Sequence, residues 1–216
     1  GHEVEVLTGF PNYPRGKVFP GYRIKLYQQE IMNGVRVHRL PLYPSHDKSA
    51  LRRIVNYLSF AFSAFLMGPW LVKKPDVIYV YNLVTLGLPA FFLRLLYGSK
   101  VIIDVQDLWP ESVASSGMLG NKFILSILNA YCNWVYRKAD CLVVLSPGFK
   151  TYLMSHGVSS GKIKIIYNWC DENGIRNQSP VDKRSDSKTS GKFTILYAGA
   201  MGEVQGIETI LQCADI

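Results

Sequence analysis

Two carboxylates and a tryptophan stand close together, directly after the apolar run Val101–Val105. They are Asp107, Trp109 and Glu111, and Pro110 lies between the last two. A tryptophan ring can stack on the apolar face of a sugar, and a carboxylate accepts hydrogen bonds from hydroxyl groups. The pattern also fits the start of a helix, with Asp107 as the cap and Glu111 in the first turn, so both interpretations stay open.

Three other polar or aromatic loops follow predicted strands. They are Phe10–Gly16 after Val4–Thr8, Asn168–Asp171 after Ile163–Tyr167, and the segment from Ser146 after Leu142–Leu145. The first of these loops presents Asn12 and Tyr13, with positive charge from Arg15. Ligands of open α/β sheets bind beyond the carboxyl ends of the strands, so four such loops together predict a cleft.

A glycine-rich stretch, Gly199 to Gly206, follows the last predicted strand and precedes an apolar, helix-like segment. It includes Gly202 and Gln205. Backbone N–H groups at such a junction can bind a diphosphate, and glycines allow the close approach that this requires. A tight strand-to-helix turn with no ligand explains the same residues, so the motif alone leaves both interpretations open.

Short apolar runs rich in β-branched and aromatic residues alternate with helical segments. The predicted strands are Val4–Thr8, Val35–Leu40, Val77–Tyr81, Val101–Val105, Leu142–Leu145, Ile163–Tyr167 and Phe193–Ala198. The predicted helices are Leu51–Val72, Val84–Tyr97, Lys122–Lys138 and Gly148–His156. Several strands are continuously apolar, which is typical of parallel strands buried on both faces. The alternation predicts a doubly wound, Rossmann-like α/β fold.

A polar segment divides the 216 residues. The stretch from Arg176 to Lys192 has almost nothing to bury and is typical of a linker. We therefore predict a first domain over residues 1–175, a linker over 176–191, and the beginning of a second Rossmann-like domain over 192–216.

The net charge of +8 is concentrated in the first half, where residues 1–100 contain 13 Lys/Arg and 5 Asp/Glu. Such a surface suits anionic lipid, a pyrophosphate-linked ligand or nucleic acid, although a solvated basic face is also open. The segment Ile54–Val72 holds no charged residue and is flanked by basic pairs. Its length is enough to span a membrane. Its Asn, Ser, Gly and Pro residues favour a helix that is buried or lies on a membrane surface.

The four cysteines, Cys132, Cys141, Cys170 and Cys213, form no C-x-x-C pair, and no histidine stands at ligand spacing from them. This pattern disfavours zinc. Free thiols are typical of a reducing compartment, and Cys141, inside an apolar run, is predicted to be buried.

Taken together, these motifs resemble the GT4-type glycosyltransferases with the GT-B fold. Within them, the chain resembles the bacterial branch that includes the L-fucosamine transferases of O-antigen and capsule synthesis. The resemblance rests on four motifs: Phe10–Pro14, Asp107–Ser112, Asn168–Asp171 and Tyr197–Gly206.

The resemblance implies a retaining, metal-free transfer of a sugar from a nucleotide-sugar to a polyprenyl-diphosphate-linked acceptor at the cytoplasmic face of the inner membrane. The donor sugar would be N-acetyl-L-fucosamine. The first domain would bind the acceptor through Asn12, Tyr13, Arg15, Asp107, Trp109 and Glu111. The donor would be bound mainly by the second domain, through Gly199, Gly202, Gln205 and Gly206, together with Asn168 near the end of the first. The catalytic residues stay unassigned.

The chain also departs from this family. Ala200 and Gln205 stand where many relatives carry basic residues, and the first strand, expected before Gly1, and the paired glutamates, expected after Ile216, lie outside the sequence. We therefore expect residues 1–216 alone to be inactive. Two alternatives stay open: a GT-B-fold sugar-nucleotide epimerase, which the scattered histidines disfavour, and a non-catalytic membrane-binding or nucleic-acid-binding module. Because the lysines and arginines are dispersed, nucleic acid is not an expected partner.

Overall fold

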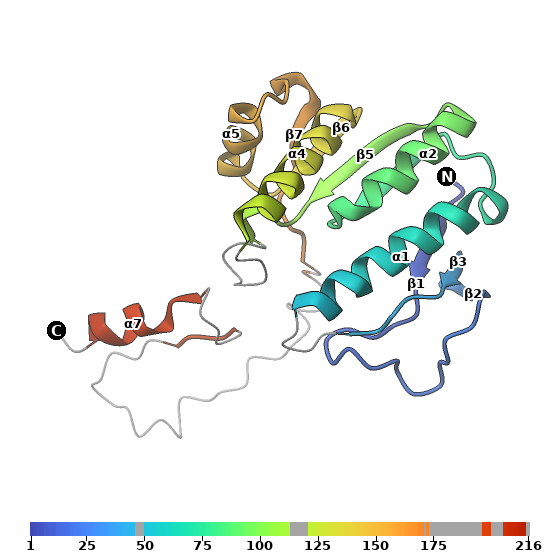
Figure 1. Cartoon of the computed structure of the whole chain (residues 1–216), viewed down its shortest axis with the longest axis horizontal. Coiled ribbons are helices and arrows are strands. Elements are labelled where there is room, and N and C mark those ends of the chain that lie inside the picture. The colour runs from blue at the N-terminus through green and yellow to red at the C-terminus, as the bar shows by residue number, and fades with distance from the viewer. Residues whose placement is uncertain (46–49, 113–120, 171, 173–195, 200–204, 215–216) are drawn as a thin grey trace. The chain divides into compact units, whose positions relative to one another are not determined.

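The computed structural model describes residues 1–45, 50–112, 121–170, 172, 196–199 and 205–214 (Figure 1). The chain forms two compact units, Gly1–Tyr167 and Asn168–Ile216. The predicted domain boundaries, which place the linker over 176–191, fall on residues outside this description and stay predictions.

The first unit contains a three-stranded sheet with the order β1-β3-β2. β1 (Glu5–Gly9) pairs in parallel with β3 (Val35–Leu40), and β2 (Gln28–Met32) pairs antiparallel with β3. Two of these strands were predicted, but β2 was not, because its sequence QQEIM is too polar for a buried strand. It lies at the edge of the sheet, where polar residues are tolerated.

A second sheet of four parallel strands has the order β4-β5-β6-β7. The strands are β4 (Val77–Tyr81), β5 (Lys100–Val105), β6 (Cys141–Val144) and β7 (Ile163–Ile165). All four were predicted to within two residues at either end. The mixed α/β architecture with a parallel sheet confirms the predicted Rossmann-like fold class.

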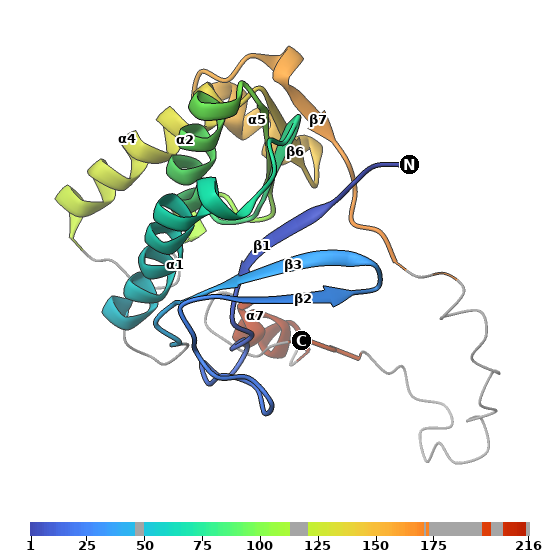
Figure 2. The ribbon, with the colours of Figure 1, turned by 90° about the vertical axis from the view of Figure 1, so that its right-hand side faces the viewer.

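Helices connect the strands, as Figures 1 and 2 show. They are α1 (Ala50–Leu71), η1 (Val84–Leu86) leading into α2 (Gly87–Tyr97), α4 (Lys122–Lys138) and α5 (Pro147–Ser155), with the short η2 (Ser160–Lys162) before β7. Asn121 caps α4, and Ser146 caps α5 by accepting a bond from the Phe149 N–H. Asparagine and serine are both favoured at this position, because their side-chain oxygens accept bonds from the first N–H groups of a helix.

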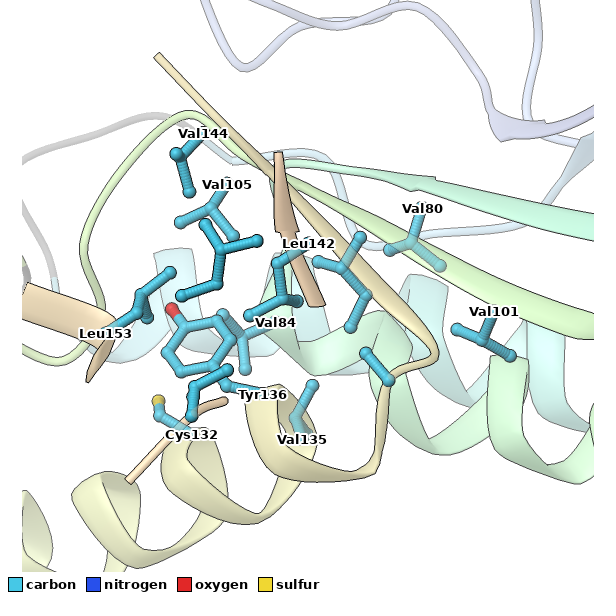
Figure 3. Packing of buried hydrophobic residues seen from close by; sticks show 14 of the residues in the cluster. Val80, Val84, Val101, Val105, Cys132, Val135, Tyr136, Leu142, Val144 and Leu153 are labelled. Atoms are coloured by element: carbon cyan, nitrogen blue, oxygen red, sulfur yellow. The ribbon is translucent and has the colours of Figure 1, made fainter. Parts of the chain in front are cut away.

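The hydrophobic core lies between the four-stranded sheet and its helices. Figure 3 shows Tyr136 and Cys132 of α4 packed beneath valines of the parallel strands, with Leu153 of α5 beside them. Cys132 is fully buried, whereas Cys141 is only partly buried. The prediction that Cys141 is buried was therefore wrong, because Cys141 is the first residue of β6, where the strand emerges from the core.

The second unit contributes one described helix, α7 (Ile207–Ala214). The first half of the predicted strand Phe193–Ala198 lies outside the described residues, and its last three residues, 196–198, are not in a strand. Leu196 is 86% exposed, so this part of the predicted strand is not buried in the unit.

Candidate functional site

The carboxyl ends of β4 and β5 are joined through Asn82. This residue adopts a left-handed backbone conformation, with φ of 61°. Its N–H donates to the carbonyl oxygen of Asp104 at 2.9 Å, and its Nδ2 donates to the Asp107 carboxylate at 3.1 Å. Asparagine tolerates this conformation better than most residues. The backbone of Asn82 can therefore turn the chain after β4 while its side chain holds the loop that contains Asp107.

Asp104 is a buried carboxylate in β5, only 6% exposed. The Tyr79 hydroxyl donates to its Oδ2 at 2.5 Å, and Gln106 Nε2 donates to its Oδ1 at 2.7 Å. Burial, followed by the hydrogen bond to Asp104, raises the pKa of Tyr79, so its hydroxyl stays protonated as a donor. Each oxygen of the Asp104 side chain thus has a donor, and a polar group without a partner would be costly to bury.

Asp107 itself is exposed, and its carboxylate is held from β4 by Asn82. An exposed carboxylate with one oxygen bound keeps acceptor capacity for hydroxyl groups of a ligand. The predicted sugar-contacting role of Asp107 is compatible with this position and stays a prediction.

Trp109 lies between the Asp107 loop and α1. Its ring meets the ring of Tyr57 edge to face, with centroids 5.9 Å apart, and its carbonyl oxygen accepts a bond of 3.5 Å from the Tyr136 hydroxyl. The Trp109–Pro110 peptide bond is cis. The indole is half-buried, so part of its surface is available to a ligand.

Glu111 is exposed but acts electrostatically on buried groups of α4 and α5. Burial, followed by the charge of Glu111, raises the pKa of Cys132 to about 12, so this thiol is an unreactive core residue. Burial and the Glu111 carboxylate also raise the pKa of Tyr152. Glu111 is therefore near enough to Cys132 and Tyr152 to act on them through its charge.

The loop after β1 contains the other predicted acceptor residues. Asn12 Nδ2 donates to the carbonyl oxygen of Phe10 at 2.9 Å, and the Phe19 N–H donates to the Pro11 carbonyl oxygen at 3.0 Å. Phe10 is 1% exposed and anchors the loop, while Tyr13 and Arg15 are exposed. This loop and the Asp107 loop follow strands of different sheets, and each is held by its own contacts.

The predicted donor residues belong to the second unit. Asn168, Gly199 and Gln205 are exposed, and Gly206 has a φ of 57° immediately before α7. The Thr209 N–H donates to the Gly206 carbonyl oxygen at 3.0 Å, as at the start of a helix. Gly202 lies outside the described residues. Gly206 therefore lies directly before a helix, while the role of the glycine-rich stretch in diphosphate binding stays a prediction.

Among the residues that the structure describes, no group of three or more His, Cys, Asp or Glu side chains is placed to hold a metal ion. The expectation that neither a metal nor another cofactor is needed stays a prediction.

The sequence of the first unit matches a known protein family. The model of the glycosyl transferase 4-like domain matches residues 1–169. The chain belongs to this family. The match covers all of β1 to β7, including both loops with predicted acceptor residues, and it confirms the resemblance found in the sequence.

Two curated bacterial proteins are similar to this glycosyl transferase 4-like chain. WcaI of Escherichia coli K12, whose name assigns it to colanic acid biosynthesis as a glycosyl transferase, is 26% identical over 231 residues, covering 100% of this chain and 55% of WcaI. WbjE of Pseudomonas aeruginosa, named as a glycosyltransferase, is 27% identical over 183 residues, covering 81% of this chain and 45% of WbjE. The chain thus spans about half the length of these relatives.

The sequence analysis missed Asn82 and Asp104. Asp104 is the polar member of the apolar run Val101–Val105, and Asn82 follows directly on the predicted strand Val77–Tyr81. A charged residue inside a buried strand needs partners, and that signal could have drawn attention to the end of β5.

Proposed function

We propose that the protein is a retaining glycosyltransferase of bacterial polysaccharide biosynthesis. It transfers a sugar, for which N-acetyl-L-fucosamine is the leading candidate, from a nucleotide-sugar to a polyprenyl-diphosphate-linked acceptor in O-antigen or capsule synthesis. The observation that carries this proposal is the family match over residues 1–169. The name of WcaI, which refers to colanic acid biosynthesis, supports polysaccharide synthesis as the setting.

The acceptor sugar binds, in this proposal, at the carboxyl end of β5. The exposed Asp107 carboxylate accepts hydrogen bonds from sugar hydroxyls, and Trp109 offers a ring for stacking. The bond from Asn82 at 3.1 Å supports this assignment, because it fixes one oxygen of Asp107 and leaves the other for a ligand. Glu111 and the loop with Asn12, Tyr13 and Arg15 complete the acceptor side.

The donor side of the proposal lies in the second unit. The diphosphate of the nucleotide-sugar binds mainly to backbone N–H groups of the Gly199–Gly206 segment, which includes Gly202 and Gln205. Asn168 also contacts it. The transfer uses no metal. Because the chain spans about half the length of its curated relatives, we expect residues 1–216 alone to be inactive.

The proposed location is the cytoplasmic face of the inner membrane, where the enzyme is peripheral. A polyprenyl-linked acceptor is anchored in the bilayer, so an enzyme that uses it works at the membrane surface. The net charge of +8 supports this location, because the cytoplasmic leaflet is anionic.

The test is an assay of the complete protein with a panel of radiolabelled UDP- and GDP-sugars and membranes that carry polyprenyl-diphosphate sugars. We expect label in the lipid fraction with at least one donor, and loss of this label in the Asp107→Ala variant. The anomeric configuration of the product, measured by NMR, tests retention.

A different result would lead to the epimerase alternative. If no donor labels the lipid but a free nucleotide-sugar is converted to its epimer without acceptor, the proposed transfer is wrong. Label that persists unchanged in Asp107→Ala would remove Asp107 from the acceptor site while leaving the transfer intact.

A further inference from the structure

The exposed face of α1 is apolar, which is the reverse of an ordinary surface helix. Apart from Arg52, the exposed residues of this helix are large and apolar: Leu51, Val55, Leu58, Phe62, Leu66 and Trp70. With about 100° between successive residues, these six lie within one stripe about 120° wide. Phe62 is 65% exposed and Trp70 is 88% exposed. Soluble monomers rarely present such a continuous stripe to water.

The opposite face of α1 packs against the rest of the first unit. Ala61, Ala64 and Gly68 are buried, and a Cβ added to Gly68 would lie 3.5 Å from Leu7 and 3.7 Å from Leu93. The Ser63 hydroxyl donates to the Pro41 carbonyl oxygen at 2.7 Å. Among the described helices, α1 alone is long and apolar enough to cross a membrane. Crossing would break these contacts, whereas lying flat on a membrane would keep them.

The apolar stripe continues onto the neighbouring helices α2 and α4. The Phe65 and Phe92 rings stack at 4.5 Å between α1 and α2, and the Phe91 and Trp134 rings meet edge to face at 5.2 Å between α2 and α4. Figures 1 and 2 both show the three helices side by side. The exposed residues of α2 are Leu88, Leu95 and Leu96, and those of α4 include Phe123, Ile127 and Trp134. We call the exposed residues of these three helices the outer helix face.

The charge of the outer helix face has a single sign. The sequences of α1, α2 and α4 together contain six Lys/Arg and no Asp/Glu. Lys122 stands immediately before Phe123, and Lys138 lies one helical turn beyond Trp134 on the same side of α4. A symmetric second copy would bring these cations against one another, which disfavours a homodimer through this face. An anionic surface complements them.

We propose that the outer helix face is the membrane-docking surface, with the apolar side chains of α1, α2 and α4 inserted into an anionic bilayer and the lysines at its headgroups. This inference rests on the proposed function only for the membrane location. It adds which face of the enzyme meets the lipid, and therefore how the acceptor loops are oriented above it. A docked apolar stripe with basic ends accounts for both the exposure and the charge.

The test is co-sedimentation of the complete protein with vesicles. Phosphatidylcholine vesicles with added phosphatidylglycerol should bind it, and pure phosphatidylcholine vesicles should bind it more weakly. The triple variant Phe62→Gln/Leu66→Gln/Trp70→Gln should reduce the partition constant by ~100-fold or more, because each side chain loses most of its transfer into lipid. Lys122→Gln/Lys138→Gln should reduce binding to anionic vesicles several-fold and should lessen its sensitivity to salt.

Matched controls separate insertion from general hydrophobicity. Ile31→Gln removes an equally apolar side chain, 72% exposed on β2, and should leave vesicle binding unchanged. The thermal unfolding midpoint of the triple variant should match that of the wild type, because the replaced side chains are exposed. If that variant does not fold, Leu88→Gln/Leu95→Gln on α2 provides the same comparison.

Three results would overturn the inference. In the first, the triple variant binds vesicles as well as the wild type does. In the second, the wild type does not bind vesicles but forms a dimer that the triple variant does not form. In the third, the wild type neither binds vesicles nor dimerises, because another segment of the whole protein covers this face. Transfer to a water-soluble, short-chain acceptor should stay unchanged in the triple variant. Loss of all transfer by the wild type with every acceptor would count against the proposed function and not against the docking surface.

Discussion

Asn82, at the end of β4, donates a hydrogen bond of 3.1 Å to the carboxylate of Asp107, which follows β5. Its own N–H binds the Asp104 carbonyl oxygen at 2.9 Å, so one residue fixes the ends of two neighbouring strands. The contact orients an exposed carboxylate that otherwise could rotate freely. Asn82 is therefore a positioning residue for the proposed acceptor site.

Asn82→Gly should lower transfer while preserving the fold. Glycine keeps the left-handed backbone, with φ of 61°, but loses the bond to Asp107. Because a hydrogen bond to a charged group contributes about 1.5–3 kcal/mol, we expect kcat/KM for the acceptor to fall roughly tenfold or more. Steady-state kinetics of the complete protein with varied acceptor measure this change.

The matched variant Asn82→Ala adds a backbone cost of about 1–2 kcal/mol in the left-handed region, so it should also lower the unfolding midpoint. A Gly variant with the wild-type kcat/KM would show that Asp107 needs no orientation from Asn82.

Tyr79→Phe should destabilise the protein. The variant removes the 2.5 Å hydrogen bond from Tyr79 to the buried Asp104 carboxylate. Asp104 then keeps the hydrogen bond from the Gln106 side chain. We expect the free energy of unfolding to fall by about 1–3 kcal/mol, measured by urea denaturation of the complete protein. Tyr81→Phe, on the same strand and 63% exposed, is the control and should change stability little. Equal effects of the two substitutions would contradict the importance of the Asp104 bond.

His38 should make stability depend on pH. Burial lowers the pKa of His38 from its ordinary value of 6.5, an effect that Glu5 opposes and Arg36 reinforces. The unfolded chain therefore binds a proton more readily than the folded one, and the free energy of unfolding should fall as the pH drops below about 6.5. Above that pH both states hold His38 neutral, so its contribution should be constant.

Urea denaturation at several pH values compares the wild type with His38→Gln, which keeps a polar group near Tyr27 but does not titrate. The slope between neutral and mildly acidic pH should be shallower in the variant. An identical slope in both proteins would assign the pH dependence to other groups.

The parallel sheet could be predicted from sequence because its strands are short, continuously apolar and separated by helices. β2 could not be found in that way, since QQEIM is polar and its pairing comes from the partner strand. The pair Asn33-Gly34 between β2 and β3, with φ of 50° and 81°, is a common hairpin turn and was the available signal.

The candidate site was predictable only in part. Asp107 and Trp109 could be singled out by residue type after a strand, whereas the partners that hold them, Asn82 and Tyr57, come from 25 and 52 positions earlier in the chain. Local sequence patterns do not predict these two contacts, because the contacts depend on how β4, β5 and α1 pack. The apolar stripe of α1 posed a related problem, because periodicity predicts a one-sided helix without showing which side faces the core.

Two glycines in helices, Gly87 of α2 and Gly68 of α1, should respond oppositely to alanine. At Gly87, the first residue of α2, an added Cβ would lie 2.7 and 2.8 Å from the Cγ2 and Cγ1 atoms of Val135 in α4. Val135 is fully buried and cannot move aside, so Gly87→Ala should cost about 1–3 kcal/mol. At Gly68 in α1 the nearest atom, of Leu7, lies at 3.5 Å, an ordinary contact. Gly68→Ala should therefore be neutral or stabilise by up to about 1 kcal/mol through helix propensity. Thermal unfolding of the complete protein distinguishes the two, and a Gly87→Ala variant as stable as the wild type would mean that α2 and α4 pack less closely than this contact requires.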